Sequence, residues 1–296
     1  MLRIATCIVA YNRDELLVRA LSAVVKQSLA PSMIIVVDNA CLQSTEAICN
    51  DFGTLYIPGS KFDGSAGGFA RAIKASLDAN SELMWLLDDD GIPDHDCLEK
   101  LVKSLNSLDA DAVSPLSTSL DNPNVTSNSF WIGFRKTDET SILKRKTYRK
   151  NKIQFYNGVL IKRVLVEKIG LPNSSLFMRG DELDYFYRSR KAKAKLFLCT
   201  MVGFRHPSSE SEYRTSRSFL FSANIPMDEK KRYYQFRNRG YLVRQNFLLH
   251  YLVYDLIRYP VTFLILGNFD FHGFRSWASL YKKGLLGELE LFPETK

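Results

Sequence analysis

The first 116 residues alternate between short apolar runs and segments with helical spacing, and this alternation restricts the possible folds more than any other feature. The apolar runs are rich in strand-forming residues and are expected to be strands: Ile4–Val9, Met33–Val37, Thr54–Ile57, Leu83–Leu87 and Ala112–Val113. The segments between them are expected to be helices: Glu15–Gln27, Thr45–Asp51, Gly68–Ala79 and Asp94–Leu105. Strands that alternate with helices over short connections form parallel sheets covered by helices on both faces. We therefore predict an α/β fold built on a mostly parallel sheet.

Polar or small residues follow four of these strands, at the edge of the sheet where such folds bind their ligands. The four groups are Ala10–Arg13, Asp38–Asn39, a loop that ends in Gly64–Gly68, and Asp88–Gly91. The glycine-rich loop leads into a helix with Arg71 and Lys74, and the N-terminus of a helix favours anions. Taken alone, this loop is better explained as a flexible turn. The four groups together predict a functional site at the carboxyl ends of the strands.

Three consecutive aspartates follow the apolar run at 83–87. In an extended segment alternate side chains point the same way, so Asp88 and Asp90 can converge while Asp89 turns aside. Two carboxylates at the end of a buried strand repel each other unless a cation joins them. Mg²⁺ and Mn²⁺ suit such oxygen ligands and also bind phosphates. The alternative is an acidic turn that caps the helix expected from Asp94.

A second acidic cluster, formed by Asp181, Glu182 and Asp184, begins a helix expected at Leu183–Lys193. Acidic residues at a helix N-terminus are favoured by the helix dipole, which is the structural explanation. Three carboxylates within four residues exceed what capping requires, so one of them is a candidate general base.

One histidine has a suggestive position, because His206 comes shortly after a strand expected at Lys195–Cys199. It is either a structural histidine or a further ligand for a metal held by the aspartate pair.

The rest of the chain has a less regular pattern. Residues 117–163 are expected to form loops and hairpins, and residues 164–170 a short helix ended by Gly170 and Pro172. Helical spacing returns at Asp228–Tyr251, in an apolar stretch up to Leu266, and at Arg275–Gly284.

Charge and cysteine usage exclude several classes of protein. Residues 1–140 carry 11 Lys and Arg against 19 Asp and Glu, whereas residues 141–296 carry 29 against 13. The basic half is expected to attract phosphates of a nucleotide, a nucleic acid or a lipid. The five cysteines are scattered without a Cys-x-x-Cys pair, which argues against a disulfide framework and favours the cytoplasm. We expect neither a signal peptide nor a membrane-spanning helix.

These motifs, in this order, resemble the inverting, metal-dependent glycosyltransferases of family 2, which have the GT-A fold. The resemblance runs from Ile4 to about His206 and, more weakly, to the C-terminus. The segment Arg232–Arg239 also resembles the Tyr-Tyr-x-x-Arg-Asn motif of the branch with bacterial rhamnosyl- and galactofuranosyltransferases. The resemblance implies a GT-A nucleotide-sugar-binding and catalytic domain over residues 1–210. Residues 211–296 would then be a basic, helical extension near the acceptor or a membrane.

The resemblance also implies roles for particular residues. Tyr11, Asn12 and Asp38 would contact the base and ribose of the donor. Gly67, Gly68 and Arg71 would lie near its diphosphate or sugar. Asp88 and Asp89 complete the implied donor-binding set. The implied ligands of Mn²⁺ or Mg²⁺ are Asp88, Asp90 and His206. The implied base is Glu182, with Asp181 as the alternative, and Arg188 completes that motif. Two positions depart from the family pattern: the base is often Asp, and an Asn before the glycines is here Phe62.

The implied reaction transfers a sugar from a nucleotide donor to a hydroxyl group with inversion at the anomeric carbon. The Gly-Asp-Glu form of the base motif favours UDP-galactofuranose as the donor over the alternative, dTDP-rhamnose. The implied acceptor is a lipid-linked glycan or a bacterial surface polysaccharide such as the O-antigen of lipopolysaccharide.

Two other classes of protein fit the sequence less well. A nucleotidyltransferase would have a glycine-rich, basic loop after its first strand, and Ala10–Arg13 is not one. A nucleic-acid-binding module is suggested by the pI of about 9.1 and by the alternating Arg and Tyr residues at 232–241. It would leave the acidic clusters at 88–90 and 181–184 without a role, since carboxylates repel phosphate. We therefore expect no nucleic-acid partner.

The apolar stretch Phe247–Leu266 has two interpretations. Asp255, Arg258 and Pro260 interrupt it, which argues against a membrane span. Its helices either pack on the sheet domain as core, or form a basic face with Lys144–Lys152 and Lys282–Lys283. Such a face would bind the anionic inner leaflet of the cytoplasmic membrane. The second interpretation predicts a cytoplasmic protein that is peripheral at this membrane, where a lipid-linked acceptor is held.

Overall fold

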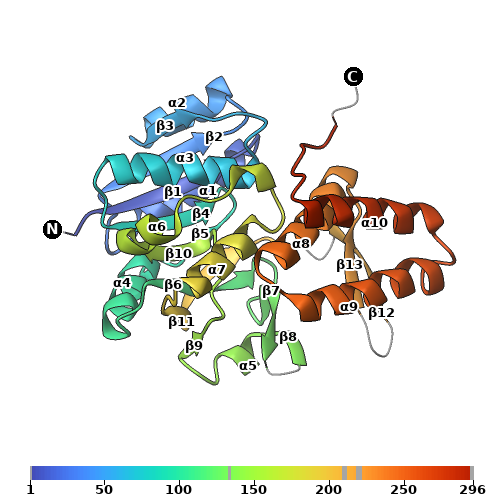
Figure 1. Ribbon diagram of the computed structural model, residues 1–296. Helices are drawn as coiled ribbons and strands as arrows, with labels where there is room; N and C mark the ends of the chain where they lie inside the picture. Colours follow the sequence, from blue (N-terminus) through green and yellow to red (C-terminus); the bar gives the residue numbers. More distant parts are fainter. Residues whose placement is uncertain (1, 133–134, 209–211, 218–221, 294–296) are drawn as a thin grey trace. The chain divides into compact units, whose positions relative to one another are not determined.

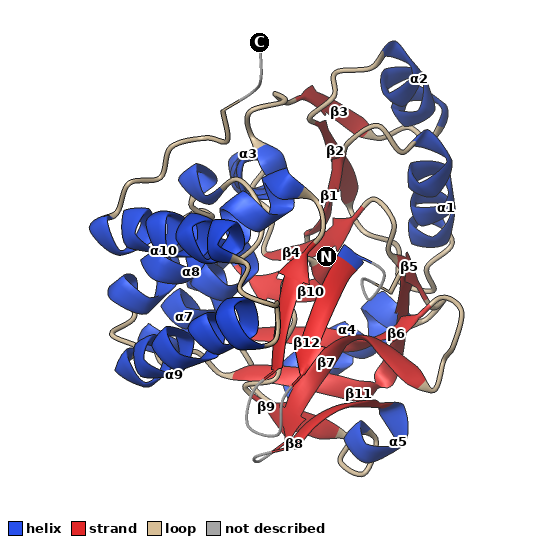
Figure 2. Cartoon of the chain, turned by 90° about the vertical axis from the view of Figure 1, so that its right-hand side faces the viewer, coloured by secondary structure: helices blue, strands red, loops and turns tan. Residues whose placement is uncertain are grey.

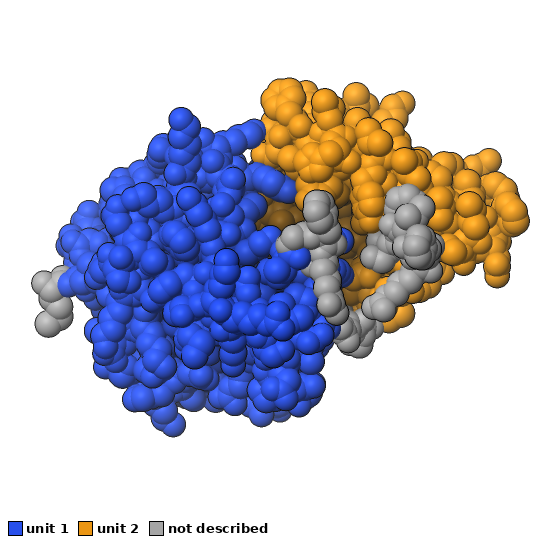
Figure 3. Space-filling model, turned by 90° about the horizontal axis from the view of Figure 1, so that it is seen from below, with its two compact units in different colours: residues 1–174, 185–208 blue, residues 175–184, 209–296 orange. Residues whose placement is uncertain are grey.

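The computed structural model describes residues 2–132, 135–208, 212–217 and 222–293. The chain forms two compact units, which are coloured separately in Figure 3. The first unit consists of residues 1–174 and 185–208, and the second of residues 175–184 and 209–296. The segment with the candidate base therefore belongs to the same unit as the C-terminal helices. The functional division at residue 210 stays a prediction.

The first unit is built on one large sheet. Its strands are β1 (Ile4–Ala10), β2 (Met33–Asp38), β3 (Leu55–Pro58), β4 (Leu83–Asp88), β5 (Ile92–Pro93), β6 (Ala112–Ser119), β7 (Val125–Ile132), β8 (Arg135–Glu139), β9 (Tyr148–Lys150), β10 (Asn157–Lys162) and β11 (Leu196–His206). The main strand order is β3-β2-β1-β4-β10-β6-β11-β5, and β7, β8 and β9 pair beside this path. Strands β1 to β4 are mutually parallel, as are β6 and β11. The predicted, mostly parallel α/β sheet is confirmed.

Helices cover both faces of this sheet (Figure 2). One face carries α1 (Asp14–Val25), α2 (Gln43–Asp51) and α4 (Cys97–Ser107); the other carries α3 (Gly64–Asp78), α6 (Arg163–Ile169) and the part of α7 (Asp181–Lys191) from Tyr185 onward. Within β1, Ile8 packs on the face covered by α1, α2 and α4, whereas Cys7 and Val9 pack on the opposite face. Because both faces are buried, the strands read as continuous apolar runs.

The expected glycine-rich loop at 64–68 is wrong, since α3 already begins at Gly64. The side-chain amide of Asn39, at the end of β2, donates to the Gly64 carbonyl over 2.7 Å. A Cβ atom on Gly68 would lie 2.5 Å from a methyl carbon of Val9. The small residues thus allow the helix to approach β1 closely. Because glycine has a low helix propensity, the sequence pattern did not predict that the helix includes them.

Two further expectations need correction. Residues 157–162 form β10, an antiparallel strand between β4 and β6 in the middle of the sheet, whereas we expected loops and hairpins outside the main sheet. The helix expected at 228–251 is broken near Phe247, whose φ is 51°. The short helix ended by Gly170 is confirmed. The remaining short helices of this part of the chain are α5 (Thr140–Leu143) and η1 (Ser174–Leu176).

The second unit combines a hairpin with a helical layer (Figure 1). Its elements are β12 (Tyr213–Arg217), β13 (Ser222–Pro226), α8 (Glu229–Gln245), α9 (Leu249–Pro260), the π-helix η3 (Val261–Ile265) and α10 (Phe271–Leu286). Phe236, Tyr259 and Trp277 are buried in its core. Helices α8 and α10 approach closely at Gly284, where a Cβ atom would lie 1.8 Å from the Arg237 carbonyl oxygen. Within the described residues, no helix is long and apolar enough to cross a bilayer.

Candidate active site

The turn after β4 places two aspartates beside the end of β11. The Gly91 N–H donates to the Asp88 carbonyl over 3.2 Å, and β5 then pairs antiparallel with the end of β11. A Cβ atom on Gly91 would lie 2.3 Å from the ring of Phe204. Glycine therefore allows this turn to pack directly on β11. The result is that Asp90 reaches His206, which is the last residue of that strand.

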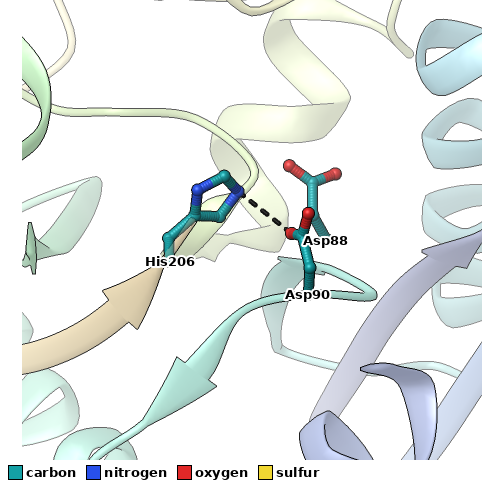
Figure 4. Close-up of side chains that lie close together, drawn as sticks. All are labelled: Asp88, Asp90 and His206. Atoms are coloured by element: carbon teal, nitrogen blue, oxygen red, sulfur yellow. Dashed lines mark ion pairs between the residues drawn. The ribbon is translucent and has the colours of Figure 1, made fainter. Parts of the chain in front are cut away.

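Asp88, Asp90 and His206 form a compact cluster (Figure 4). The Nε2 atom of His206 lies 3.0 Å from Oδ1 of Asp90, and ligand atoms of all three residues lie within 4.8 Å of one another. The other ring nitrogen of His206, Nδ1, lies 2.8 Å from the Pro207 carbonyl oxygen. A proton on Nδ1 donated to this carbonyl leaves Nε2 directed at the carboxylates, an arrangement typical of metal-binding histidines.

The electrostatics of this cluster are strongly coupled. Burial raises the pKa of Asp88, and the neighbouring Asp90 carboxylate raises it further. Burial alone would lower the pKa of His206, but the hydrogen bond and charge of Asp90 outweigh it and raise this pKa to about 9. Burial likewise opposes ionisation of Asp90, yet His206 and Arg13 hold its pKa below the usual value. Without metal, the cluster therefore retains protons at neutral pH.

Arg13 belongs to this site, although the sequence analysis gave it no role. Its guanidinium pairs with Asp89 over 2.9 Å and with Asp90 over 2.5 Å. Strands β1 and β4 are neighbours with Val9 opposite Asp88, so the residues that follow them emerge side by side. The signal was available: adjacent carboxylates require a nearby positive charge, and Arg13 follows an adjacent strand.

Asp89 does not belong to the cluster of Asp88, Asp90 and His206, but it lies in the turn after β4 and not on the extended segment that we expected. Its Oδ2 atom accepts the Tyr11 N–H over 3.1 Å. Burial raises the pKa of Asp89 to about 6, although Arg13 counteracts the effect. The side chain of Tyr11 is exposed, and Asn12 next to it has a φ of 53°. A contact of Tyr11, Asn12 or Asp89 with a donor stays a prediction.

The other predicted donor-binding residues have partners within the first unit. Asp38 is buried and accepts the backbone N–H groups of Ala40 and Leu42 over 2.9 and 2.7 Å. The Arg71 side chain is paired with Asp63 over 2.6 Å. Gly67 and Gly68 are buried in α3, near Asp63 and Val9 respectively. These contacts hold the turn after β2 and the start of α3, and donor contacts of the four residues stay predictions.

The candidate base lies in the second unit, at the N-terminus of α7. Asp181 and Asp184 are 2% and 4% exposed, whereas Glu182 is half-buried. The Gly180 N–H donates to Oε2 of Glu182 over 3.1 Å. Among these three carboxylates, Glu182 is therefore the most accessible to a substrate, and its role as base stays a prediction.

The donor set of the aspartate–histidine cluster fits a divalent cation. Two carboxylates and one imidazole supply three ligands and leave positions for phosphate oxygens. Mostly oxygen ligands favour Mn²⁺ or Mg²⁺ over metals that prefer thiolates.

A mostly parallel sheet with this acidic cluster at the carboxyl end of β4 defines a glycosyltransferase with the GT-A fold. Residues 6–170 match the model of glycosyl transferase family 2, and the chain belongs to this family.

Two curated proteins are similar to nearly the whole chain, and their names state a specific activity. The chain is 30% identical over 290 residues to galactofuranosyltransferase GlfT1 of Mycolicibacterium smegmatis, covering 95% of this chain and 96% of that protein. It is 27% identical over 285 residues to the protein of the same name from Mycobacterium tuberculosis, covering 94% and 93%.

Solved structures share the fold at low sequence identity. GalNAc-T7 with UDP, GalNAc and Mn²⁺ has a TM-score of 0.54 and 16% identity, over 70% of this chain and 44% of that one. Residues 1–349 of S. aureus TarS with UDP have a TM-score of 0.55 and 10% identity, over 97% and 92%. The mannosyltransferase PcManGT of Pyrobaculum calidifontis with GDP-Man and Mn²⁺ has a TM-score of 0.52 and 16% identity, over 96% and 75%.

Proposed function

We propose that this glycosyltransferase is inverting and metal-dependent, and that it transfers galactofuranose from UDP-galactofuranose to a hydroxyl of a bacterial surface polysaccharide or lipid-linked glycan. The observation that carries the chemistry is the convergence of Asp88, Asp90 and His206 at the carboxyl end of β4. The choice of sugar is supported by the similarity to GlfT1 over nearly the whole of both chains. The choice of Mn²⁺ or Mg²⁺ is supported by the ligand set and by the Mn²⁺ named in two structures of the same fold.

The proposed reaction divides its tasks between two groups of residues. The carboxylate of Glu182 removes the proton of the acceptor hydroxyl, whose oxygen forms a bond to the anomeric carbon. The bond from that carbon to the diphosphate oxygen breaks on the opposite face, so the configuration inverts. Asp88, Asp90 and His206 would hold the metal, which would neutralise charge on the diphosphate leaving group. No covalent intermediate on the enzyme is needed.

We further propose that one surface of the second unit lies on an anionic membrane. Large apolar side chains are exposed from the turn before α9 to the first residue of α10: Phe247, Leu249, Val253, Leu256, Ile257, Ile265, Leu266, Phe269 and Phe271. Leu249, Val253 and Leu256 follow one face of α9, at spacings of four and three residues. Exposed apolar side chains that share a helix face in this way are typical of a membrane or protein contact.

The charges around this face favour a lipid surface. Residues 247–287 contain two acidic side chains, Asp255 and Asp270. Asp255 is buried between Arg239 and Arg258, and Asp270 caps α10 by accepting the Gly273 N–H. Arg275 and Lys282 are exposed on α10, and residues 247–287 carry more basic than acidic side chains. This combination suits anionic headgroups and would place the enzyme near a lipid-linked acceptor.

A donor screen tests the central proposal. The purified chain is incubated with Mn²⁺ and each of UDP-galactofuranose, UDP-galactose, UDP-glucose and dTDP-rhamnose, and release of UDP or dTDP is measured. Slow hydrolysis of UDP-galactofuranose in preference to the others is expected, with water in place of the acceptor. Preferential hydrolysis of dTDP-rhamnose would replace the donor and keep the reaction class.

A further inference from the structure

Two buried side chains on α8 reach the loop that precedes the candidate base. Arg237 and Asn238 are both fully buried, so neither can contact a substrate. The Nδ2 atom of Asn238 lies within hydrogen-bonding distance of three carbonyl oxygens, those of Leu176, Met178 and Arg179, at 2.9, 2.8 and 3.0 Å. All of these residues belong to the second unit.

Arg237 fixes the orientation of this amide and extends its reach. The Nε–H of Arg237 donates to Oδ1 of Asn238 over 2.9 Å, which leaves the amide nitrogen directed at the loop. The Nη2 atom of Arg237 donates to the carbonyls of Ser175 and Leu176 over 2.9 and 3.1 Å. Two adjacent side chains therefore bind four consecutive or nearly consecutive carbonyls of one loop.

The loop needs such support because its backbone is unfavourable by itself. Phe177, Arg179 and Gly180 have φ angles of 64°, 61° and 111°. Left-handed φ angles at non-glycine residues are unfavourable and persist only where the surroundings enforce them. Loss of the hydrogen bonds from α8 would therefore let the loop relax to another conformation.

The loop leads directly into the candidate catalytic residues. Gly180 precedes Asp181, and its N–H and C=O groups bind Oε2 of Glu182 and the N–H of Asp184. A Cβ atom on Gly180 would lie 3.2 Å from Leu242 and 3.4 Å from Cβ of Asn238, so α8 also packs against this residue. The position of Glu182 therefore depends on Gly180, which contacts both the Glu182 side chain and α8.

The aromatic residues one turn earlier on α8 complete the arrangement. The ring of Tyr234 stacks on Phe177 of the loop, with ring centroids 4.6 Å apart. The guanidinium of Arg237 lies 5.7 and 4.8 Å from the ring centroids of Tyr233 and Tyr234. Residues three and four positions apart share one face of a helix, which explains why these four residue types occur at this spacing.

We propose that Tyr233, Tyr234, Arg237 and Asn238 form a positioning clamp that holds the loop 175–180 and thereby orients the catalytic carboxylate of Glu182. The clamp accounts for the whole Tyr-Tyr-x-x-Arg-Asn motif, whose function the reaction scheme leaves open. This inference rests on the proposed role of Glu182 and assigns the motif a task separate from donor binding.

The first experiment tests the clamp independently of activity. Asn238→Asp keeps the size of the side chain but replaces the donating amide by a carboxylate facing three carbonyl oxygens. Asn246→Asp is the matched control at the C-cap of α8, because Nδ2 of Asn246 donates to the Leu242 carbonyl of that helix and not to the loop. Hydrogen exchange of the peptide 175–184 should accelerate at least about tenfold in Asn238→Asp and remain unchanged in Asn246→Asp. Unchanged exchange in a folded Asn238→Asp protein would overturn the clamp.

The second experiment tests the link to catalysis. Asn238→Asp should misplace the base and lower kcat about 10²-fold. The stoichiometry of UDP binding and the KM for the donor should change less than about twofold. A loss of folded protein would instead lower UDP stoichiometry in parallel with the rate. In the Glu182→Gln background, Asn238→Asp should cause little further loss, because both changes remove the same contribution. Full multiplication of the two losses, or a normal kcat, would overturn the positioning role.

A milder variant covers the case in which Asn238→Asp does not fold. Glu212 is half-buried and joins Arg179 of the loop to Lys231 of α8. Glu212→Gln should lower kcat several-fold with unchanged UDP stoichiometry, and a normal rate would count against the clamp. If the wild-type chain turns over no donor, the proposed function fails, while hydrogen exchange still decides whether the clamp exists.

Discussion

The Nε2 atom of His206 lies 3.0 Å from Oδ1 of Asp90, and this contact joins the end of β11 to the turn after β4. The pairing of β5 with β11 makes the contact possible. A carboxylate oxygen of Asp88 lies within 4.8 Å of both groups, so the chain offers two carboxylates and an imidazole to one cation. Removal of one ligand is therefore the most direct test of metal dependence.

Asp90→Ala should lower donor turnover on the order of 10²-fold or more, the scale of losing one stabilising group at a developing charge. EDTA should reproduce the loss in the unmodified chain, and Mn²⁺ or Mg²⁺ should reverse it there. Asp96→Ala removes a carboxylate paired with Lys100 at the start of α4 and should retain full activity. Full turnover of the wild-type chain in excess EDTA would rule out metal dependence.

The affinity of the cluster for Mn²⁺ should rise with pH. Burial and the adjacent Asp90 raise the pKa of Asp88, and Asp90 outweighs burial to raise the pKa of His206 to about 9. Both residues must lose their protons before they can bind a metal. The apparent affinity should therefore increase by up to about tenfold per pH unit for each proton released, until about pH 9.

Calorimetric titration with Mn²⁺ in buffers of different ionisation enthalpy measures the protons released. His206→Ala should remove the component between about pH 7 and 9. The metal-free protein should show the linked effect on stability: a folded-state pKa above the ordinary 6.5 stabilises the protein below pH 6.5, and this contribution is lost as pH rises towards 9. A Mn²⁺ affinity independent of pH would contradict these pKa shifts.

The identity of the base can be settled by comparing two isosteric substitutions. Glu182→Gln should leave UDP binding intact and lower transfer on the order of 10²-fold or more, because an amide cannot accept the proton of the hydroxyl. Asp181→Asn should be less harmful to chemistry, since Asp181 is buried whereas Glu182 is half-buried. An inactive Asp181→Asn enzyme together with an active Glu182→Gln enzyme would move the assignment by one residue.

Much of the fold could be predicted because local pattern and tertiary environment agree. The runs that became β1, β2 and β4 are apolar on both faces and are flanked by helical segments, so period and length identified them. Strand β10 was missed because its place between β4 and β6 depends on antiparallel pairing with segments distant in sequence. No local pattern encodes such pairing.

The candidate site shows the same division. The sequence predicted that Asp88 and Asp90 converge, but on an extended segment, whereas β4 ends at Asp88 and a turn brings Asp90 to the cluster. The contact of Arg13 with Asp89 and Asp90 required knowledge that β1 and β4 are neighbours. The segment Gly64–Gly68 suggested a ligand-binding loop, but close packing of α3 on Val9 explains its small residues.

Gly284→Ala should destabilise the second unit strongly. Its Cβ atom would lie 1.8 Å from the carbonyl oxygen of Arg237 and 2.7 Å from the Tyr241 nitrogen, both on α8. Backbone atoms cannot move aside as side chains do, so α8 and α10 must separate, at a cost of about 1–3 kcal/mol or more. Lys282→Ala, at an exposed position of α10, is the control and should change thermal stability little. Equal melting temperatures of the two variants would show that the helices adjust without loss.

The exposed apolar residues at the start of α10 should attach the protein to anionic membranes. Phe269 and Phe271 are 69% and 58% exposed, and their rings lie 6.1 Å apart. The chain should sediment with vesicles containing phosphatidylglycerol at low salt and be released at high salt, because salt screens the attraction of Arg275 and Lys282. Burial of a phenylalanine contributes about 1.5–3 kcal/mol, so Phe269→Ser with Phe271→Ser should weaken binding at least about tenfold.

Val164→Ser with Met201→Ser removes two exposed apolar side chains from the first unit and should bind as the wild type does. Equal binding to phosphatidylcholine vesicles would contradict the electrostatic part of the proposal, and no binding to either would contradict the membrane face while leaving the transferase chemistry intact.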